Sequence, residues 1–282
     1  MQIRPRLCSL VLLLLAGFPL CAQQKLEESA CLAKAGQPVG ALAWSDDASF
    51  FATAWNNSVI LWKAGSNEIA AVFSAHSAPI KSLRFSGDGK RLLSLGEDNM
   101  IVVRELDLPA GEIRVMGSSL APLSDAVFAD DSGSLILPRD SYSTALYYRL
   151  RYTNQFVSRL LHQSASPVLS LDISRDGSRL LVATKDGMVT LVQVKTGKII
   201  ATYPRSVISA IPPRFSPDGT AFVAAADSTS LVVTPVGGQG TLPLYDAAQP
   251  VNAAVFSPDS RQIAVAVKDG SVKVFSRYTG SV

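Results

Sequence analysis

Short apolar segments with alternating polar positions run along this chain, and polar turns separate them. The clearest example is the stretch 256–275, FSPDSRQIAVAVKDGSVKVF, in which a Ser-Pro-Asp-Ser turn follows Phe256. Ile263, Val265 and Val267 then alternate along a second strand, and a Lys-Asp-Gly turn leads into a third. Period-two alternation bounded by turn residues indicates antiparallel strands. This stretch therefore predicts a β-meander.

The turn that follows the apolar residue recurs six times, and the successive copies are 41, 43, 45, 42 and 41 residues apart. A second turn with a β-branched run follows five of the copies after roughly a dozen residues, and the third copy deviates, with a turn at 139–142 that leads into Leu146, Tyr147 and Tyr148. A period near 42 with four short strands is typical of a propeller blade. The residues that lead the six turns are Trp44, Phe85, Phe128, Ile173, Phe215 and Phe256.

The repeat predicts an all-β fold, a β-propeller of four-stranded antiparallel blades. Six blades are expected, and a seven-bladed ring completed by a missing or partner-supplied segment is the alternative. Five outer fourth strands are expected at Ile69–Phe73, Ile113–Met116, Phe156–Leu161, Ile199–Tyr203 and Leu242–Tyr245.

The last blade has no outer strand of its own, because the chain stops seven residues after Phe275. The repeat spacing places residues 26–33 beside Val272–Phe275, so an N-terminal strand would close the ring and cover edges that promote aggregation. The segment LEESACLAKAG has helical propensity, so tertiary pairing would have to override it.

These residues resemble the WD-repeat family of β-propellers over nearly all of residues 37–278. The resemblance rests on FSPDG at 215–219, DGSVKVF at 269–275 and the Thr-Gly-Lys step at 196–198. It implies that the turns between second and third strands share one face with the fourth-to-first connections, and that partners bind there.

The family's His–Ser/Thr–Asp–Trp hydrogen-bond set is mostly missing, which makes this a degenerate member. Trp62 stands at the tryptophan position in the first blade, while His76 matches the family's Gly-His step in the second, with Asp98 as its expected partner. In other blades the tryptophan position holds Arg104, Thr234 or Phe275.

The first 22 residues differ from the repeats and read as a secretory signal peptide, which leaves 23–282 as the propeller domain. Arg4 and Arg6 precede an apolar run from Leu7 to Leu20 that is short for a bilayer span, and a small residue and polar residues follow it. The expected location is therefore periplasmic or secreted. An uncleaved anchor and a lipid anchor at Cys21 are the alternatives, and no other membrane insertion is expected.

Charge and cysteine content change little in this picture. Removal of residues 1–22 would take away two arginines and leave 24 basic against 23 acidic residues, a balance that gives no field for binding nucleic acid. Cys31 would then be the only cysteine, too few for an intramolecular disulfide, and a small packed residue is its expected role.

Catalytic and metal-binding patterns are absent from the sequence, so we expect no enzyme and no cofactor. There is no Gly-x-Ser-x-Gly elbow and no Gly-rich phosphate loop, and two histidines are too few for the usual zinc site. His162 is expected in a loop. The repeated aspartates Asp88, Asp176, Asp218 and Asp259 are expected to cap turns rather than bind a metal.

A protein partner is the expected ligand, bound by the loops of one rim. Trp55 is singled out as an aromatic anchor in a polar turn, although it could equally fold over a neighbouring blade. The alternatives are a propeller enzyme acting on a small molecule or glycan in the central funnel, and a carbohydrate-binding module. The candidate contact residues are Trp55, Asn57, His76, Asp98, Arg139, Tyr142, Lys185, Asp186, Asp227, Lys268 and Asp269.

Overall fold

The computed structural model describes most of the chain from residue 39 to residue 280. The described ranges are 39–66, 68–74, 76–107, 112–116, 125–130, 133–149, 156–204, 211–227, 229–238, 240–246 and 249–280. The predicted signal peptide, Cys31 and the predicted closing strand 26–33 lie outside these residues. The described part contains strands and turns, and no helix in it could cross a membrane.

The first three sheets each contain four antiparallel strands. The first sheet has β1 (Val39–Trp44), β2 (Phe50–Trp55), β3 (Ser58–Lys63) and β4 (Ile69–Ser74). The second has β5 (Ile80–Phe85), β6 (Arg91–Gly96), β7 (Met100–Glu105) and β8 (Glu112–Met116). The third has β9 (Val127–Phe128), β10 (Leu135–Pro138), β11 (Ser143–Arg149) and β12 (Phe156–Gln163).

The remaining three sheets continue the same order. The fourth has β13 (Val168–Ile173), β14 (Arg179–Thr184), β15 (Met188–Gln193) and β16 (Ile199–Pro204). The fifth has β17 (Arg214–Phe215), β18 (Ala221–Ala225), β19 (Ser230–Pro235) and β20 (Leu242–Asp246). The sixth has three described strands, β21 (Val251–Phe256), β22 (Gln262–Val267) and β23 (Val272–Ser276).

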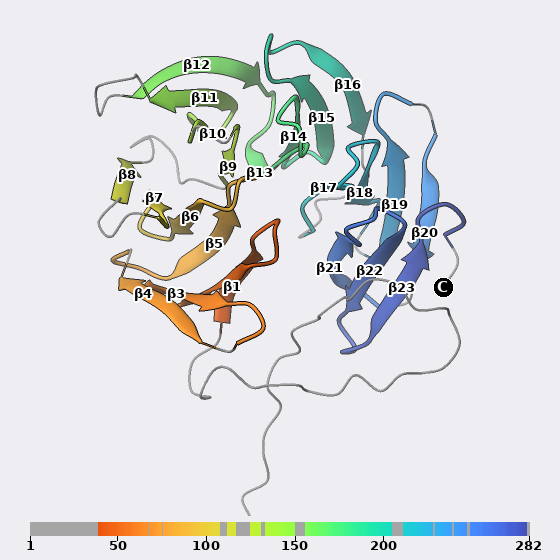
Figure 1. Cartoon of the computed structure of the whole chain (residues 1–282). Coiled ribbons are helices and arrows are strands. Elements are labelled where there is room, and N and C mark those ends of the chain that lie inside the picture. The colour runs from red at the N-terminus through yellow and green to blue at the C-terminus, as the bar shows by residue number, and fades with distance from the viewer. Residues whose placement is uncertain are drawn as a thin grey trace, which may run out of the picture.

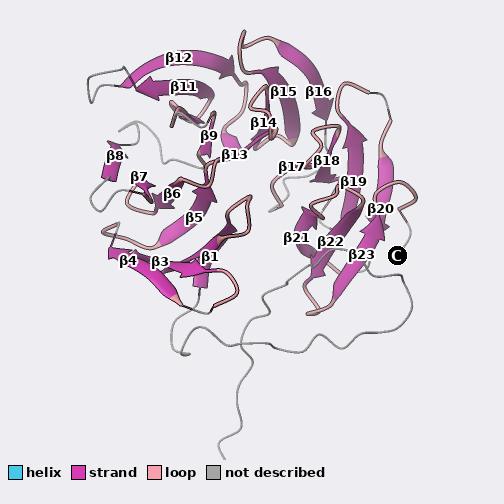
Figure 2. Ribbon diagram, viewed as in Figure 1, coloured by secondary structure: helices cyan, strands magenta, loops and turns pink. Residues whose placement is uncertain are grey.

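Each sheet is a meander, and the six sheets follow one another around a ring (Figure 1). The first strand of each sheet lies toward the centre and the fourth lies at the circumference, and all six are built from strands and loops (Figure 2). The molecule is therefore a six-bladed β-propeller, as the repeat predicts. The five outer strands expected from the sequence are β4, β8, β12, β16 and β20, each within three residues of its expected bounds.

Neighbouring blades are joined by apolar cores. Ile80 and Leu83 of β5 are buried against Ala52 and Ala54 of β2, so the inner strand of one blade packs on the preceding blade. Val168 and Leu171 of β13 and Val251 and Ala254 of β21 pack in the same way on the blades before them. In each of these inner strands the two buried apolar residues are three positions apart, because the register of the strand shifts between them.

The seam between the sixth and first blades differs from the others. Val39 and Leu42 of β1 are 49% and 42% exposed, whereas Ile80 and Leu83, at the same positions of β5, are 3% and 5% exposed. This is the seam at which the sequence predicts closure by residues 26–33. Closure by that strand stays a prediction, because the segment lies outside the described residues.

A serine–aspartate turn joins the first and second strands in five of the six blades. In the fifth blade the Ser216 hydroxyl donates to Asp218 at 2.5 Å and accepts from the Ala221 backbone N–H at 3.0 Å. The same hydroxyl–carboxylate pair occurs at Ser45–Asp47, Ser86–Asp88, Ser174–Asp176 and Ser257–Asp259. These contacts confirm that the repeated aspartates cap turns.

The charge state of these turn aspartates follows from the same contacts. Hydroxyl donation by Ser174 and Ser178 lowers the pKa of Asp176 to about 2. The carboxylate is thus the form that the turn stabilises. A left-handed residue completes the turn, with φ +69° at both Gly89 and Gly177, and Ala48 adopts φ +56° at the same position of the first blade.

Candidate interaction face

One face of the ring is formed by the turns between second and third strands together with the connections between successive blades. Backbone hydrogen bonds join the two kinds of loop: Ile80 N–H donates to Asn56 O at 2.7 Å, and Glu97 N–H donates to Pro79 O at 2.8 Å. The same pattern joins Lys185 to Pro167 and Lys268 to Pro250. This arrangement agrees with the one that the resemblance implies. We call this surface the turn face.

His76 and Asp98 are on the turn face but are not available to a partner. The His76 side chain is fully buried, with Nδ1 2.9 Å from Asp98 Oδ1 and Nε2 2.9 Å from the Ser94 hydroxyl. Burial opposes ionisation of Asp98, but hydrogen bonds from the Ser77 N–H and from His76 outweigh it and lower the pKa of that carboxyl. The predicted pairing is confirmed, and the prediction of His76 as a contact residue is wrong.

The other aspartates in the turns of this face, Asp140 and the predicted Asp186, Asp227 and Asp269, are bound within their own turns. Asp140 accepts from the Tyr142 N–H at 2.8 Å and from the Ser143 hydroxyl at 2.7 Å. Hydroxyl donation by Ser143 and the Tyr142 N–H together lower its pKa. Asp186, Asp227 and Asp269 make equivalent contacts to backbone N–H groups two residues ahead. Their carboxylates therefore fix the shape of the turns.

Trp55 is the last residue of β2, where it pairs with Ser58 of β3 and Val39 of β1. It is half-buried, so the expectation of a tryptophan standing in a polar turn is wrong. The strand extends this far because Asn56 takes up the turn with φ +53°, a conformation that Asn adopts more readily than Trp. Asn57 beside it is also half-buried.

Exposed side chains on the turn face come from three other turns. Arg139 and Tyr142 flank the β10–β11 turn, and Tyr142 is 46% exposed. Lys185 and Lys268 are exposed in the β14–β15 and β22–β23 turns. The β10–β11 turn is firmly held, because the Tyr142 carbonyl accepts from the Ser164 N–H at 2.6 Å. Asp186 and Asp269 are exposed beside the two lysines, so six of the predicted contact residues are exposed in the structure.

A β-bulge near the turn face adds exposed positions that the sequence did not indicate. In four blades the register of the inner strand shifts at the same point. The residues at this shift are Gly40, Lys81, Leu169 and Asn252, and Leu169 is 37% exposed. Bulges re-aim side chains and are common beside binding sites. Each of them lies four positions before the residue that leads its turn, and this constant spacing is the signal that could have located them.

The centre of the ring contains a second feature that sequence reasoning missed, a chain of ion pairs across four blades. Arg84 of β5 contacts Asp125 at 3.2 Å and Asp172 of β13 at 3.4 Å. Arg214 of β17 contacts the same Oδ1 of Asp172 at 3.1 Å. Burial disfavours the charge of Arg84, but the two carboxylates outweigh burial and raise its pKa. We call these four residues the channel chain.

The channel chain also ties the blades together through the backbone. Asp125 accepts from the Leu171 N–H at 3.1 Å, and Asp172 accepts from the Phe215 N–H at 2.8 Å. Each carboxylate thus binds the inner strand of the next blade. A carboxylate with an arginine and a backbone donor is well satisfied, so the aspartates of this chain have a structural role.

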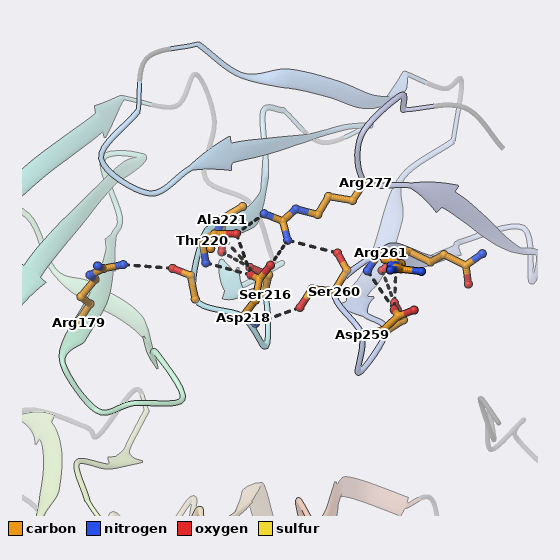
Figure 3. A network of polar contacts seen from close by, with 12 residues as sticks. Arg179, Ser216, Asp218, Thr220, Ala221, Asp259, Ser260, Arg261 and Arg277 are labelled. Carbon is orange, nitrogen blue, oxygen red and sulfur yellow. Dashed lines mark hydrogen bonds and ion pairs between the residues drawn. The ribbon is translucent and has the colours of Figure 1, made fainter. Parts of the chain in front are cut away.

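The opposite face of the ring uses its polar groups to join the fifth and sixth blades (Figure 3). Arg277, just after β23, donates to Asp218 at 2.6 Å and to the Thr220 hydroxyl. The Asp218 N–H donates to the Ser260 hydroxyl at 3.0 Å. The sixth blade is therefore fastened to the fifth by side chains as well as by an apolar core.

Chemistry at the histidines finds no support in this geometry. His162 lies in β12 and is buried, so the loop expected for it is wrong; the strand simply continues to Gln163. Burial lowers the pKa of its imidazole. Among the residues that the structure describes, no three His, Cys, Asp or Glu side chains gather into a possible metal site.

Six meandering sheets around a polar axis, with one face of exposed turns, define a repeat propeller. The family model described as WD domain, G-beta repeat matches residues 29–63, 67–104, 155–192 and 240–276, which together make up just over half of the chain. The chain therefore belongs to the WD40 repeat family.

Relatives and solved structures agree with this assignment. The chain is 23% identical over 223 residues to the serine-threonine kinase receptor-associated protein of Gallus gallus, covering 78% of this chain and 61% of that protein. It is 23% identical over 155 residues to the retinoblastoma-binding protein homolog 5 of Caenorhabditis elegans, covering 54% and 34% of the two chains. The chain thus spans from about a third to three fifths of the length of these relatives.

The fold itself is shared with a crystal structure of the Cps50 (Swd1) β-propeller domain of Myceliophteria thermophila. The two superpose with a TM-score of 0.74 at 16% identity, covering 88% of this chain and 86% of that domain. WD-repeat relatives of this kind suggest a protein-interaction scaffold.

Proposed function

We propose that this protein is an exported, non-catalytic scaffold that binds a protein partner on its turn face. The observation that carries the proposal is the β10–β11 turn, where exposed Arg139 and Tyr142 stand on a backbone fixed by Asp140 and Ser164. Arginine and tyrosine are enriched at interfaces, and a rigid turn loses little entropy on binding.

The relatives support this class of function. The names of two of them describe proteins that bind or associate with another protein. Lys185 and Lys268 extend the accessible surface around the ring.

Export is the part of the proposal that rests on residues 1–22 alone. The partner would then be a component of the cell envelope or of the extracellular space. Fractionation of cells that express the full chain tests the location, and loss of residues 1–22 from the exported form is the expected result. Retention of the uncleaved chain in the cytoplasm would contradict export. A Cys21→Ser variant tests for a lipid anchor. If Cys21 is lipidated, this substitution should release the protein from the membrane fraction.

The binding proposal is tested by affinity capture from an envelope extract with the purified protein. Arg139→Ala combined with Tyr142→Ala is expected to weaken capture of the retained partner at least about 10-fold, because interface anchors of this type often contribute 2 kcal/mol or more. Lys198→Ala combined with Arg261→Ala is the control, since both residues are exposed in turns of the opposite face. Equal loss in the two double variants, or no loss in either, would refute the turn face as the binding surface.

A further inference from the structure

We propose that the junction of the third and fourth blades on the turn face binds a segment of the partner in which an apolar side chain stands beside an aspartate or glutamate. This inference rests on the proposed function and adds where on the turn face the partner binds and what chemistry it must carry. Leu169 and Lys185 of the fourth blade are the contact residues that it adds to Arg139 and Tyr142.

Backbone hydrogen bonds join the β10–β11 turn to the start of β13. The Ser141 carbonyl accepts from the Val168 N–H at 2.7 Å. Tyr142 follows the first of these residues and Leu169 follows the second. The Ser164 N–H, which donates to the Tyr142 carbonyl, holds the same two segments together a second time. The backbone positions of Tyr142 and Leu169 are therefore fixed close to each other, and both side chains are exposed.

This junction has more exposed apolar surface than the other described turns of the face. Leu169 occupies the β-bulge of the fourth blade, and the same position holds glycine, lysine or asparagine in the other three blades that have the bulge. Among the described turns of this face, only the β10–β11 turn has an exposed aromatic residue, since Trp55 is half-buried. Val39 and Val272 are also exposed, but they lie at the seam that residues 26–33 are predicted to close. A contiguous exposed apolar area between polar turns is typical of an interaction site.

Two cations flank this apolar pair. Arg139 is exposed at the start of the β10–β11 turn, and Lys185 is exposed in the β14–β15 turn. The Lys185 N–H donates to the carbonyl of Pro167, two residues before Leu169, at 2.8 Å, so this turn is fixed to the same junction. Neither cationic side chain makes a hydrogen bond or an ion pair with another described residue. Both are therefore available to a partner.

The carboxylates beside these cations already accept hydrogen bonds within their turns. Asp140 is bound as described above, and Asp186 accepts from the Thr184 hydroxyl at 2.6 Å. The side chains of Arg139 and Lys185 can only donate. A carboxylate of the partner complements these donors, whereas a basic group would bring like charges together. An acidic residue next to an apolar one thus matches both parts of the junction.

Selection of random linear peptides displayed on phage against the immobilised full-length protein tests this inference. The expected peptides carry a recurring Asp or Glu close to an aliphatic or aromatic residue. Their affinity for Leu169→Ala should fall about 10- to 100-fold, as loss of a buried leucine contact would give. Leu160→Ala is the matched control, because Leu160 is an equally large exposed side chain of the outer strand β12, and it should leave the affinity unchanged.

Lys185→Ala tests the charge of the junction. It should weaken the acidic peptides up to about fivefold, as loss of an exposed ion pair would give. The difference from the wild type should shrink at high salt, because salt screens exposed charges. Lys198→Ala is the control, since this lysine is exposed on the opposite face of the same blade.

Thermal unfolding of each variant shows whether the propeller is intact, and Lys185→Ala decides the outcome if Leu169→Ala unfolds early. Selected peptides without acidic residues would overturn the inference, as would peptides that bind Leu169→Ala and Lys185→Ala as tightly as the wild type. If such peptides still lose affinity for the Arg139→Ala and Tyr142→Ala double variant, the proposed function stands and only the added contacts are refuted. Failure to select any peptide, or peptides that bind this double variant like the wild type, would count against both.

Discussion

Nδ1 of His76 lies 2.9 Å from Oδ1 of Asp98, and this contact joins the connection before β5 to the turn after β6. The other ring nitrogen faces the Ser94 hydroxyl, and Asp98 also accepts from the Ser77 N–H at 2.9 Å. A carboxylate can only accept, so the facing ring nitrogen donates its proton to Asp98. These contacts form a buried polar network in the second blade.

The Asp98→Ala variant should therefore be markedly less stable. It would leave the buried imidazole N–H and the Ser77 N–H without an acceptor, at a cost of about 2–3 kcal/mol in the free energy of unfolding. Urea denaturation measures the change. Asp269→Ala is the control, because that exposed carboxylate accepts only within its own turn, and its effect should be smaller. Equal losses of unfolding free energy in the two variants would show that the His76–Asp98 contact adds no more stability than an ordinary turn contact.

A substitution at Thr144 is expected to stabilise the protein rather than destabilise it. Its hydroxyl is fully buried and has no hydrogen-bond partner among the described residues. Thr144→Val removes an unsatisfied donor and keeps the shape, so it should raise the free energy of unfolding by about 1–2 kcal/mol. Thr184→Val is the matched control and should destabilise, because the Thr184 hydroxyl donates to Asp186 at 2.6 Å. A Thr144→Val variant less stable than wild type would show that the hydroxyl is satisfied.

The buried imidazole of His162 predicts a pH dependence. Burial lowers its pKa below the ordinary value of 6.5, so the unfolded chain binds the proton more readily than the folded one. The stability that His162 contributes is therefore complete above pH 6.5 and is lost as the pH falls through 6.5 toward the folded pKa. Between pH 7 and 5, His162→Leu should flatten the decline in unfolding free energy, whereas Thr144→Val should retain it. An unchanged slope in His162→Leu would contradict the burial of this group.

The predicted closing strand can be tested by deletion. The first family match begins at residue 29. The later matches begin at residues 67, 155 and 240, where the outer strands β4, β12 and β20 of the preceding blades lie. Removal of residues 26–33 should lower the melting temperature and promote self-association, because the edge of β23 would stay unpaired. Removal of residues 281 and 282 is the control. If both truncations melt and sediment like the intact protein, residues 26–33 do not close the ring.

The fold could be predicted because its determinants are local. The turn at Ser257 and Asp259 is formed by residues close in sequence, and the same short pattern recurs in five blades. β14 and β22 each have three consecutive buried residues, as expected for strands enclosed on both sides by neighbouring blades. Each repeat therefore carries most of the information for its own blade.

The channel chain could not be predicted in this way. Arg84 and Asp172 are 88 residues apart, and they meet only because the ring brings four inner strands together. Trp55 was misplaced for a related reason, since the end of β2 depends on which residue takes the left-handed turn position, here Asn56. The burial of His76 was likewise decided by contacts from two other segments.

Hydrogen–deuterium exchange of the protein alone and with its captured partner tests the central claim most directly. The account predicts slower exchange in the β10–β11, β14–β15 and β22–β23 turns, which contain Tyr142, Lys185 and Lys268. The serine–aspartate turns of the opposite face should exchange at the same rate in both states. Protection confined to the opposite face, with the turn face unchanged, would contradict the account.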